Sequence, residues 1–162
     1  MRDKGFVAEH RGGSLTKENH RKLISWARQC SEHVLPLIVE NIDMRLVNAL
    51  NLAKEWENEN ATVGKAMKAS VGAHAVARES SDQTLKAVAR SIGHAVATAH
   101  MADHSLGAAL YALKAVKQAG KSVDEERQWQ NKLLQSIFIS VSSEIVELVL
   151  TTLMKKDKYL KI

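Results

Sequence analysis

Residues 93–115 read GHAVATAHMADHSLGAALYALKA, and this stretch decides the fold class. Apolar residues recur at every third or fourth position through it and through the segments on either side, as one face of a helix requires. An unbroken helix over residues 82–120 would have 39 residues, far more than the roughly 8–20 residues of a globular helix. We therefore predict two helices with a break near His100–Asp103, and Asp103 as the candidate N-cap of the second helix.

Alanine dominates the part of the chain around this stretch. Of the 59 positions between Ala61 and Ala119, 17 are alanine, and four of the eight glycines also lie here. Small side chains allow helix axes to approach to ~8 Å, so we expect the most tightly packed helix pairs in this centre. The tetrapeptide HAVA occurs at His74–Ala77 and again at His94–Ala97, which indicates two adjacent helices that present similar small faces.

Helix start and stop signals organise the rest of the chain. Residues able to cap a helix N-terminus precede the apolar periodic segments, and Gly120 is suited to follow a helix end. The candidate caps are Thr16, Asp43, Thr62, Asp82 and Ser122. One proline and eight glycines are too few turn residues for an all-β chain. The sequence predicts an all-α single domain of six to eight packed helices over residues 16–162, preceded by a flexible lead-in over residues 1–15.

The charge of the chain is basic but evenly spread. The net charge is +5, of which residues 1–81 carry +2 and residues 82–162 carry +3. Nucleic-acid-binding domains concentrate basic residues on one face, so this distribution argues against a nucleic-acid partner. No apolar run approaches the length of a membrane span, and the N-terminus lacks the apolar core of a signal peptide. A cytoplasmic location without membrane contact is therefore expected.

Four of the seven histidines lie in the alanine-rich centre, and they are the candidate site residues. They are His74, His94, His100 and His104, and Asp103 joins them in the segment HMADH over residues 100–104. On a continuous helix His100 and His104 share one face, and two such histidines with a carboxylate can ligate one metal ion. His94 precedes His100 by six residues, about 120° around a straight helix, and joins the pair only at a break.

Three interpretations of these five residues stay open. They form a polar cluster at a helix junction with Asp103 as a cap, a metal site made of His100, Asp103 and His104, or a catalytic or pH-sensing site. The chain has no HEXXH motif, no CXXC pair, no GXSXG elbow and no glycine-rich phosphate loop. These absences favour the polar cluster, and neither a catalytic residue nor a cofactor is predicted.

Other conspicuous residues have structural interpretations. The three tryptophans, Trp26, Trp56 and Trp129, fall on apolar helical faces and are predicted core anchors. Cys30, the single cysteine, lies on the apolar face of the first long helix and is predicted to be a small buried side chain. The charged residues at Asp43–Arg45 and Arg78–Glu79 are predicted to form local ion pairs or caps.

Five segments in fixed order resemble immunity proteins of bacterial polymorphic-toxin systems. They are HRKLISWARQCSEHVLPL at 20–37, DMRLVNALNLAKEW at 43–56, AHAVARE at 73–79, GHAVATAHMADHSLGAALYALKA at 93–115 and ERQWQ at 126–130. The resemblance covers roughly residues 20–134 and includes the pattern of tryptophans and histidines, namely Trp26, Trp56, His94, His100, His104 and Trp129. It implies a small all-helical domain that neutralises a toxin made by the same cell, and it supplies no catalytic residues.

The resemblance favours a non-enzymatic module that binds a cognate toxin and occludes it, through a preformed surface of roughly 800 Å² per partner. The alternative is a metal-binding protein or enzyme with a His/Asp site at the His100–His104 break. A basic chain is poorly matched to a basic nuclease toxin. The stretch after Leu134 is more apolar than the resemblance leads us to expect, which predicts homo-oligomers through the C-terminal helices.

Overall fold

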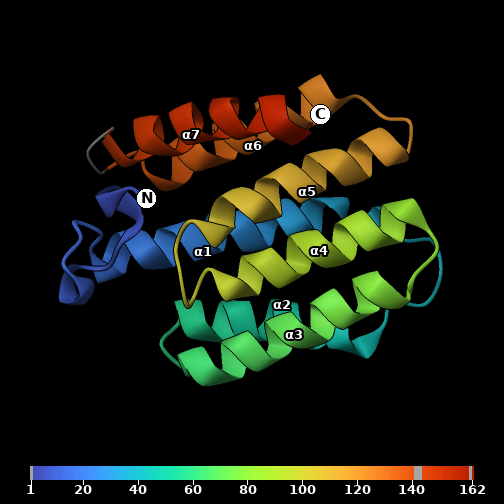
Figure 1. Cartoon of the computed structure of the whole chain (residues 1–162), viewed down its shortest axis with the longest axis horizontal. Coiled ribbons are helices and arrows are strands. Elements are labelled where there is room, and N and C mark those ends of the chain that lie inside the picture. The colour runs from blue at the N-terminus through green and yellow to red at the C-terminus, as the bar shows by residue number, and fades with distance from the viewer. Residues whose placement is uncertain (1, 141–143, 161) are drawn as a thin grey trace.

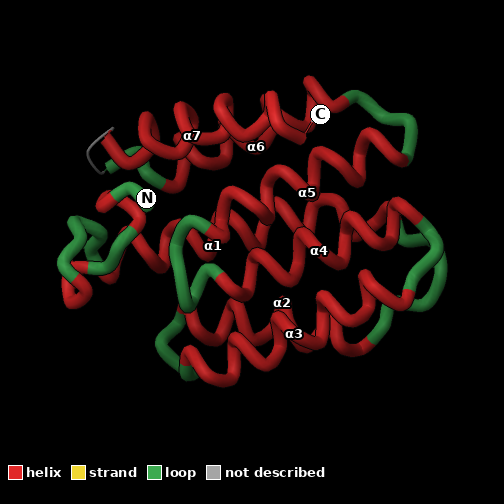
Figure 2. The backbone as a smooth tube through the Cα atoms, in the orientation of Figure 1, coloured by secondary structure: helices red, strands yellow, loops and turns green. Residues whose placement is uncertain are grey.

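In the part of the chain that the structure describes, seven α-helices pack in three layers (Figure 1). The computed structural model describes residues 2–140, 144–160 and 162. The helices are α1 (Lys17–Val34), α2 (Met44–Glu57), α3 (Val63–Glu79), α4 (Gln83–Ala97), α5 (His104–Gln118), α6 (Val123–Ile137) and α7 (Glu144–Leu160). Helices α1, α4 and α5 form the central layer, with α2 and α3 on one side and α6 and α7 on the other (Figures 1 and 2). The prediction of an all-α single domain is confirmed.

The predicted caps hold the helix ends. The hydroxyl oxygens of Thr16, Thr62 and Ser122 accept from the backbone N–H three residues later, and the carboxylate of Asp82 accepts from two backbone N–H groups of the first turn of α4. Gly120 follows α5 with a φ of +72°, a conformation that glycine adopts without strain. These local hydrogen bonds explain why the helix boundaries could be predicted from single residues.

The alanine-rich centre is where α4 packs between α3 and α5. Ala27, Ala95 and Ala108 form a fully buried contact among α1, α4 and α5, so no long side chain separates these helices. Two buried hydroxyls satisfy each other there, because Ser31 Oγ lies 2.8 Å from Ser91 Oγ and Ser91 donates to the Ala108 carbonyl at 2.7 Å. The expected tight packing therefore includes a polar link through the central layer.

The N-terminal residues and α7 pack together on the same side of the central layer. Residues 2–15, expected as a lead-in, form two short 3-10 turns at Lys4–Phe6 and Glu9–Arg11, and Phe6 and Leu15 are buried. Leu148 of α7 lies against Gly5, and its side chain would have to shift to admit a Cβ there. Ile145 and Val149 of α7 are buried in the same apolar cluster. The apolar character of α7 is thus used inside the fold, and self-association remains a prediction.

The three tryptophans differ in burial, so the prediction that all are core anchors is only partly right. Trp26 is fully buried, and its Nε1–H donates to the Gln130 carbonyl at 3.0 Å, which ties α1 to α6. Trp56 and Trp129 are half-buried at the rim, where each contacts a histidine ring. An apolar helical face extends to the edge of the core, and spacing alone does not locate that edge. Cys30 is buried as predicted.

No helix in the described part of the chain is both long and apolar enough to cross a membrane.

Candidate functional site

The break between α4 and α5 directs the candidate residues to different surroundings. Helix α4 ends at Ala97 and α5 begins at His104, which confirms the predicted break. Because the helix is interrupted, the rule that residues four apart share a face does not apply. His100 lines a cavity at this end of the bundle, whereas His104 lies beside His94.

Asp103 has a partner that the sequence did not indicate. It occupies the N-cap position of α5, but its side chain accepts no hydrogen bond from the helix, so the prediction of a capping carboxylate is wrong. Its Oδ2 instead accepts from Arg2 Nε at 2.6 Å. Asp103 adopts helical φ and ψ values, whereas a capping residue is extended. The ion pair attaches the N-terminal segment to the α4–α5 turn.

Three of the predicted residues come together on one face. His74 of α3, His94 of α4 and His104 of α5 form what we call the histidine cluster. The His94 and His104 Nδ1 atoms are 3.3 Å apart, so one donates and the other accepts according to tautomer. The His74 and His94 rings meet edge to face with centroids 5.2 Å apart, and Tyr111 stacks on His94 at 5.4 Å. The polar-cluster interpretation thus describes His74, His94 and His104.

Two glycines make room for these rings. A Cβ added at Gly93 of α4 would lie 2.6 Å from His74 Nε2, and a Cβ added at Gly107 of α5 would lie 2.7 Å from the His94 ring. His74 and His94 therefore each rest in a notch that the next helix provides. The HAVA repeat indicated adjacent helices with small faces. The glycine notches are part of those faces, and they accommodate the histidine rings. Gly93 and Gly107 were missed as site residues because only the packing shows which ring each receives.

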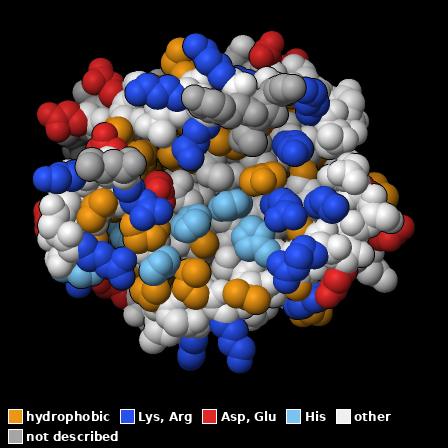
Figure 3. Space-filling model, viewed as in Figure 1, with side chains coloured by type: hydrophobic (Ala, Val, Ile, Leu, Met, Phe, Trp, Pro, Cys, Tyr) orange, Lys and Arg blue, Asp and Glu red, His pale blue; other side chains and the backbone are white. Residues whose placement is uncertain are grey.

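The histidines of the cluster are neutral at pH 7. Burial, then the neighbouring His74 and His104, and then Arg90 and Lys156 lower the pKa of His94 to about 4. Burial is also the largest cause that lowers the pKa of His74 and the pKa of His104. Figure 3 shows histidine side chains gathered near the middle of this face, with Lys and Arg side chains beside them. The face presents imidazole rings and nitrogens with cations close by.

The imidazoles of the histidine cluster can donate and accept hydrogen bonds, and they become positively charged in acid. Within the described residues no group of three or more His, Cys, Asp and Glu is placed to hold a metal ion. His100 lines the cavity and Asp103 is engaged by Arg2, so neither completes a site with the close pair of His94 and His104.

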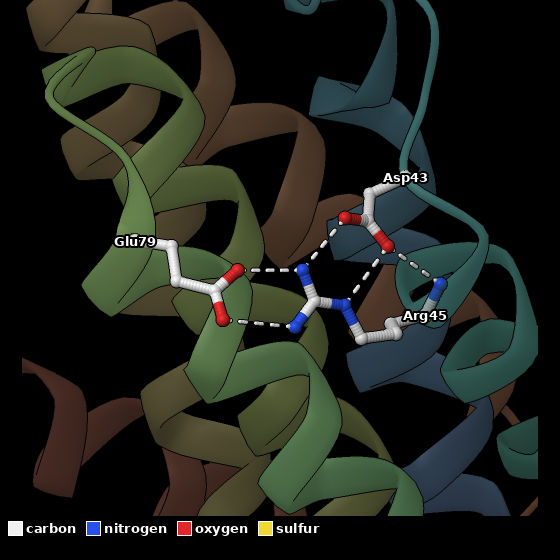
Figure 4. A network of polar contacts seen from close by, with 3 residues as sticks. All are labelled: Asp43, Arg45 and Glu79. Atoms are coloured by element: carbon white, nitrogen blue, oxygen red, sulfur yellow. Dashed lines mark hydrogen bonds and ion pairs between the residues drawn. The ribbon is translucent and has the colours of Figure 1, made fainter.

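The predicted Asp43–Arg45 ion pair is present, but Glu79 at the end of α3 pairs with Arg45 and not with Arg78. Arg45 donates to both carboxylates, with its Nη2 at 2.8 Å from Asp43 Oδ2 and at 2.7 Å from Glu79 Oε2 (Figure 4). The guanidinium lowers the pKa of Asp43 and the pKa of Glu79 through these hydrogen bonds. The network joins the start of α2 to the end of α3, and its exposure limits its contribution to stability.

The histidine cluster predicts a pH-dependent stability. The pKa of folded His94, about 4, is below its ordinary value of 6.5, so the unfolded chain binds more protons between these values. Stability contributed by neutral His94 is fully present above pH 6.5 and is lost as the pH falls toward 4. His74, His104, Tyr111, Arg90 and Lys156 are the groups that face it.

We expect the free energy of unfolding to fall by roughly 1–3 kcal/mol more in the wild type than in His94→Gln between pH 7 and pH 4.5. Urea unfolding at the two pH values measures this difference. Carboxylates titrate in both proteins, so their effect cancels in the comparison. An equal loss in the two proteins would contradict the assigned pKa.

Comparison with known proteins places the chain in a family. A search of curated proteins finds no match, and neither does a search of solved structures. Residues 13–137 match the family described as Imm-5 like putative immunity protein. The match includes the whole histidine cluster and both glycine notches, and it covers more than half of the chain. The chain therefore belongs to the Imm-5 like putative immunity protein family.

Proposed function

We propose that this protein is a non-enzymatic binding module that neutralises a cognate toxin by occluding it in the cytoplasm of the producing cell. The family match over residues 13–137 is the observation that carries the proposal, because an immunity role requires a protein partner. Occlusion needs a stable surface of standard interface size rather than reacting groups.

The rigidity of the histidine cluster supports this mode of action. The rings of His74 and His94 lie in notches. The buried Ser31–Ser91 contact joins α4 to α1, and the Ser70 hydroxyl of α3 donates to the Gly93 carbonyl of α4 at 2.9 Å. A surface that is already ordered loses little conformational entropy on binding, and more of its contact energy appears as affinity. The cluster is therefore the face that we assign to the toxin.

The charge of this face indicates the character of the partner. Arg90 and Lys156 lie close enough to the cluster to lower the pKa of His94. Within the described residues, neither is in an ion pair. Electrostatic complementarity then calls for an acidic surface on the toxin, which is the opposite of the basic surface of a nuclease.

Co-expression tests the proposal. Each candidate toxin domain from the same genome is produced in a heterologous bacterial host without a leader sequence, with and without this chain. We expect growth to be restored for one toxin domain, and the purified pair to elute as one complex. We expect Arg90→Glu and Lys156→Glu to weaken the complex at least tenfold, and the matched charge reversal Lys54→Glu on α2 to leave it unchanged. Failure of every domain to be neutralised would contradict the immunity role.

A further inference from the structure

A cavity lies at the α4–α5 turn, next to the histidine cluster. The cavity, of about 450 Å³, opens where the N-terminal segment, the connection between α2 and α3 and the α4–α5 turn meet. Its volume is in the range of ligand sites in proteins. The α4–α5 turn borders both sites, because it supplies His100 and Met101 to the cavity and leads into His104 of the cluster.

The base of the cavity is apolar and aromatic. Trp56 packs on His20 with ring centroids 4.7 Å apart, and Phe6, Val63 and Met101 line the same space. His20 Nε2 lies 2.5 Å from the Thr98 carbonyl oxygen and must donate to it, because a carbonyl only accepts. Burial lowers the pKa of His20, so this ring is neutral. The base therefore offers a flat apolar surface without a formal charge.

The rim of the cavity carries three cations, Arg11, Lys17 and Arg21, against two carboxylates, Glu9 and Glu59. Arg21 is paired with Glu59 at 3.1 Å. Arg11 has no carboxylate partner within the described residues, and its Nη1 donates to the thioether sulfur of Met101 at 3.3 Å, which is a weak acceptor. Lys17 also lines the cavity and takes part in none of the ion pairs found among these residues. Arg11 is thus an incompletely satisfied cation at the edge of an apolar surface.

We propose that this cavity receives an apolar side chain next to a carboxylate, presented by the protein partner. The apolar group would lie on Trp56, and the carboxylate would accept from Arg11. A wholly apolar ligand would desolvate Arg11 without pairing it, which is costly. An inorganic anion would leave the Trp56 surface uncovered. The inference rests on the proposed function, because it assigns the ligand to the toxin that the histidine cluster binds.

The wall formed by Phe6 to Arg11 lies ahead of residues 13–137, the part of the chain that the family match covers. The cation that we assign to the carboxylate therefore lies outside the residues that match the family.

Two small probes test the chemistry of the cavity in the full chain. N-acetyl-phenylalanine carries an aromatic ring and a carboxylate, and its amide carries the same ring without charge. In a two-dimensional NMR spectrum the Trp56 indole N–H reports binding, and the Trp26 and Trp129 indole N–H signals are internal controls. We expect a saturable shift of Trp56 alone, with the acid binding about fivefold more tightly than the amide at low salt.

Variants locate the charge. Arg11→Gln is expected to remove the preference for the acid while the amide binds as before. Lys121→Gln, at a separate cavity beside Trp129, is the matched control and should keep the preference. An unchanged Trp26 signal shows that each variant is folded. Absence of a Trp56 shift, equal binding of acid and amide, or a preference that persists in Arg11→Gln would overturn the proposal.

Co-expression separates this inference from the proposed function. If the chain protects against its toxin and Arg11→Gln weakens that protection, both hold. If protection is complete in Arg11→Gln although the probe binds, the cavity takes a free small carboxylate, and its assignment to the partner is overturned. If the probe binds as expected and no toxin is neutralised, the proposed function fails. The assignment of the ligand to a toxin then fails too, whereas its chemical class, an apolar group next to a carboxylate, holds.

Discussion

Replacing Trp26 with alanine is expected to lower the free energy of unfolding by about 3–5 kcal/mol. The indole is fully buried between α1 and its neighbours, so the substitution opens a cavity that the surrounding helices cannot fill. It also removes the hydrogen bond that the indole donates to the Gln130 backbone carbonyl at 3.0 Å, which adds to the cost. Urea unfolding followed by far-UV circular dichroism measures the effect.

The other two tryptophans are the controls for this prediction. Trp56 and Trp129 are half-buried and pack against His20 and His33. Because less apolar area leaves water at these positions, we expect Trp56→Ala and Trp129→Ala to cost about 1–2 kcal/mol each. Equal losses at all three positions would show that Trp26 does not join α1 to α6 in the way described. A variant that is too unstable to purify can be replaced by Trp26→Phe, which keeps much of the volume and loses the hydrogen bond.

Gly93→Ala is expected to destabilise the protein by about 1–3 kcal/mol, although alanine is the better helix former. The added Cβ would lie 2.6 Å from His74 Nε2, so the ring or the two helices must move. Gly107→Ala should behave in the same way toward His94, where the distance is 2.7 Å. Thermal and urea unfolding of the single variants measure these losses.

Removing the His74 ring should reverse the sign of the effect of Gly93→Ala on stability. In a His74→Ala background, Gly93→Ala no longer meets an imidazole, and we expect it to stabilise the protein by up to about 1 kcal/mol through helix propensity. Gly64→Ala on α3 is the matched control, because only the Thr62 hydroxyl lies within 4 Å of its added Cβ. Additive effects of His74→Ala and Gly93→Ala would contradict the notch.

The helices could be predicted from the sequence because their ends are determined locally. Thr16, Thr62 and Ser122 cap through hydrogen bonds that span three residues, and such bonds depend on little beyond the segment itself. The break near His100 was predicted from length, because an unbroken helix over residues 82–120 would be longer than globular helices usually are. The fold class therefore needed no knowledge of how the helices pack.

The candidate site could be predicted only in part because its contacts join distant segments. Arg2 donates to Asp103 across 101 positions of the chain, whereas the predicted capping hydrogen bond of the Asp103 side chain is not formed. His100 and His104 are directed apart by the backbone of the turn, which periodicity does not describe. The three histidines that do meet come from three different helices, and spacing along one helix relates only neighbours on that helix.

The glycine notches constrain the order in which this protein can change through evolution. A larger residue at position 93 is tolerated only after His74 has become smaller, whereas a smaller residue at position 74 needs no prior change. The same order holds for positions 107 and 94. His94 of α4 lies in the notch at Gly107 of α5, and its neighbour Gly93 forms the notch for His74 of α3. A change in one of these pairs therefore alters the packing of the other. Related sequences should therefore vary at these four positions as linked sets, with the histidine lost before its glycine.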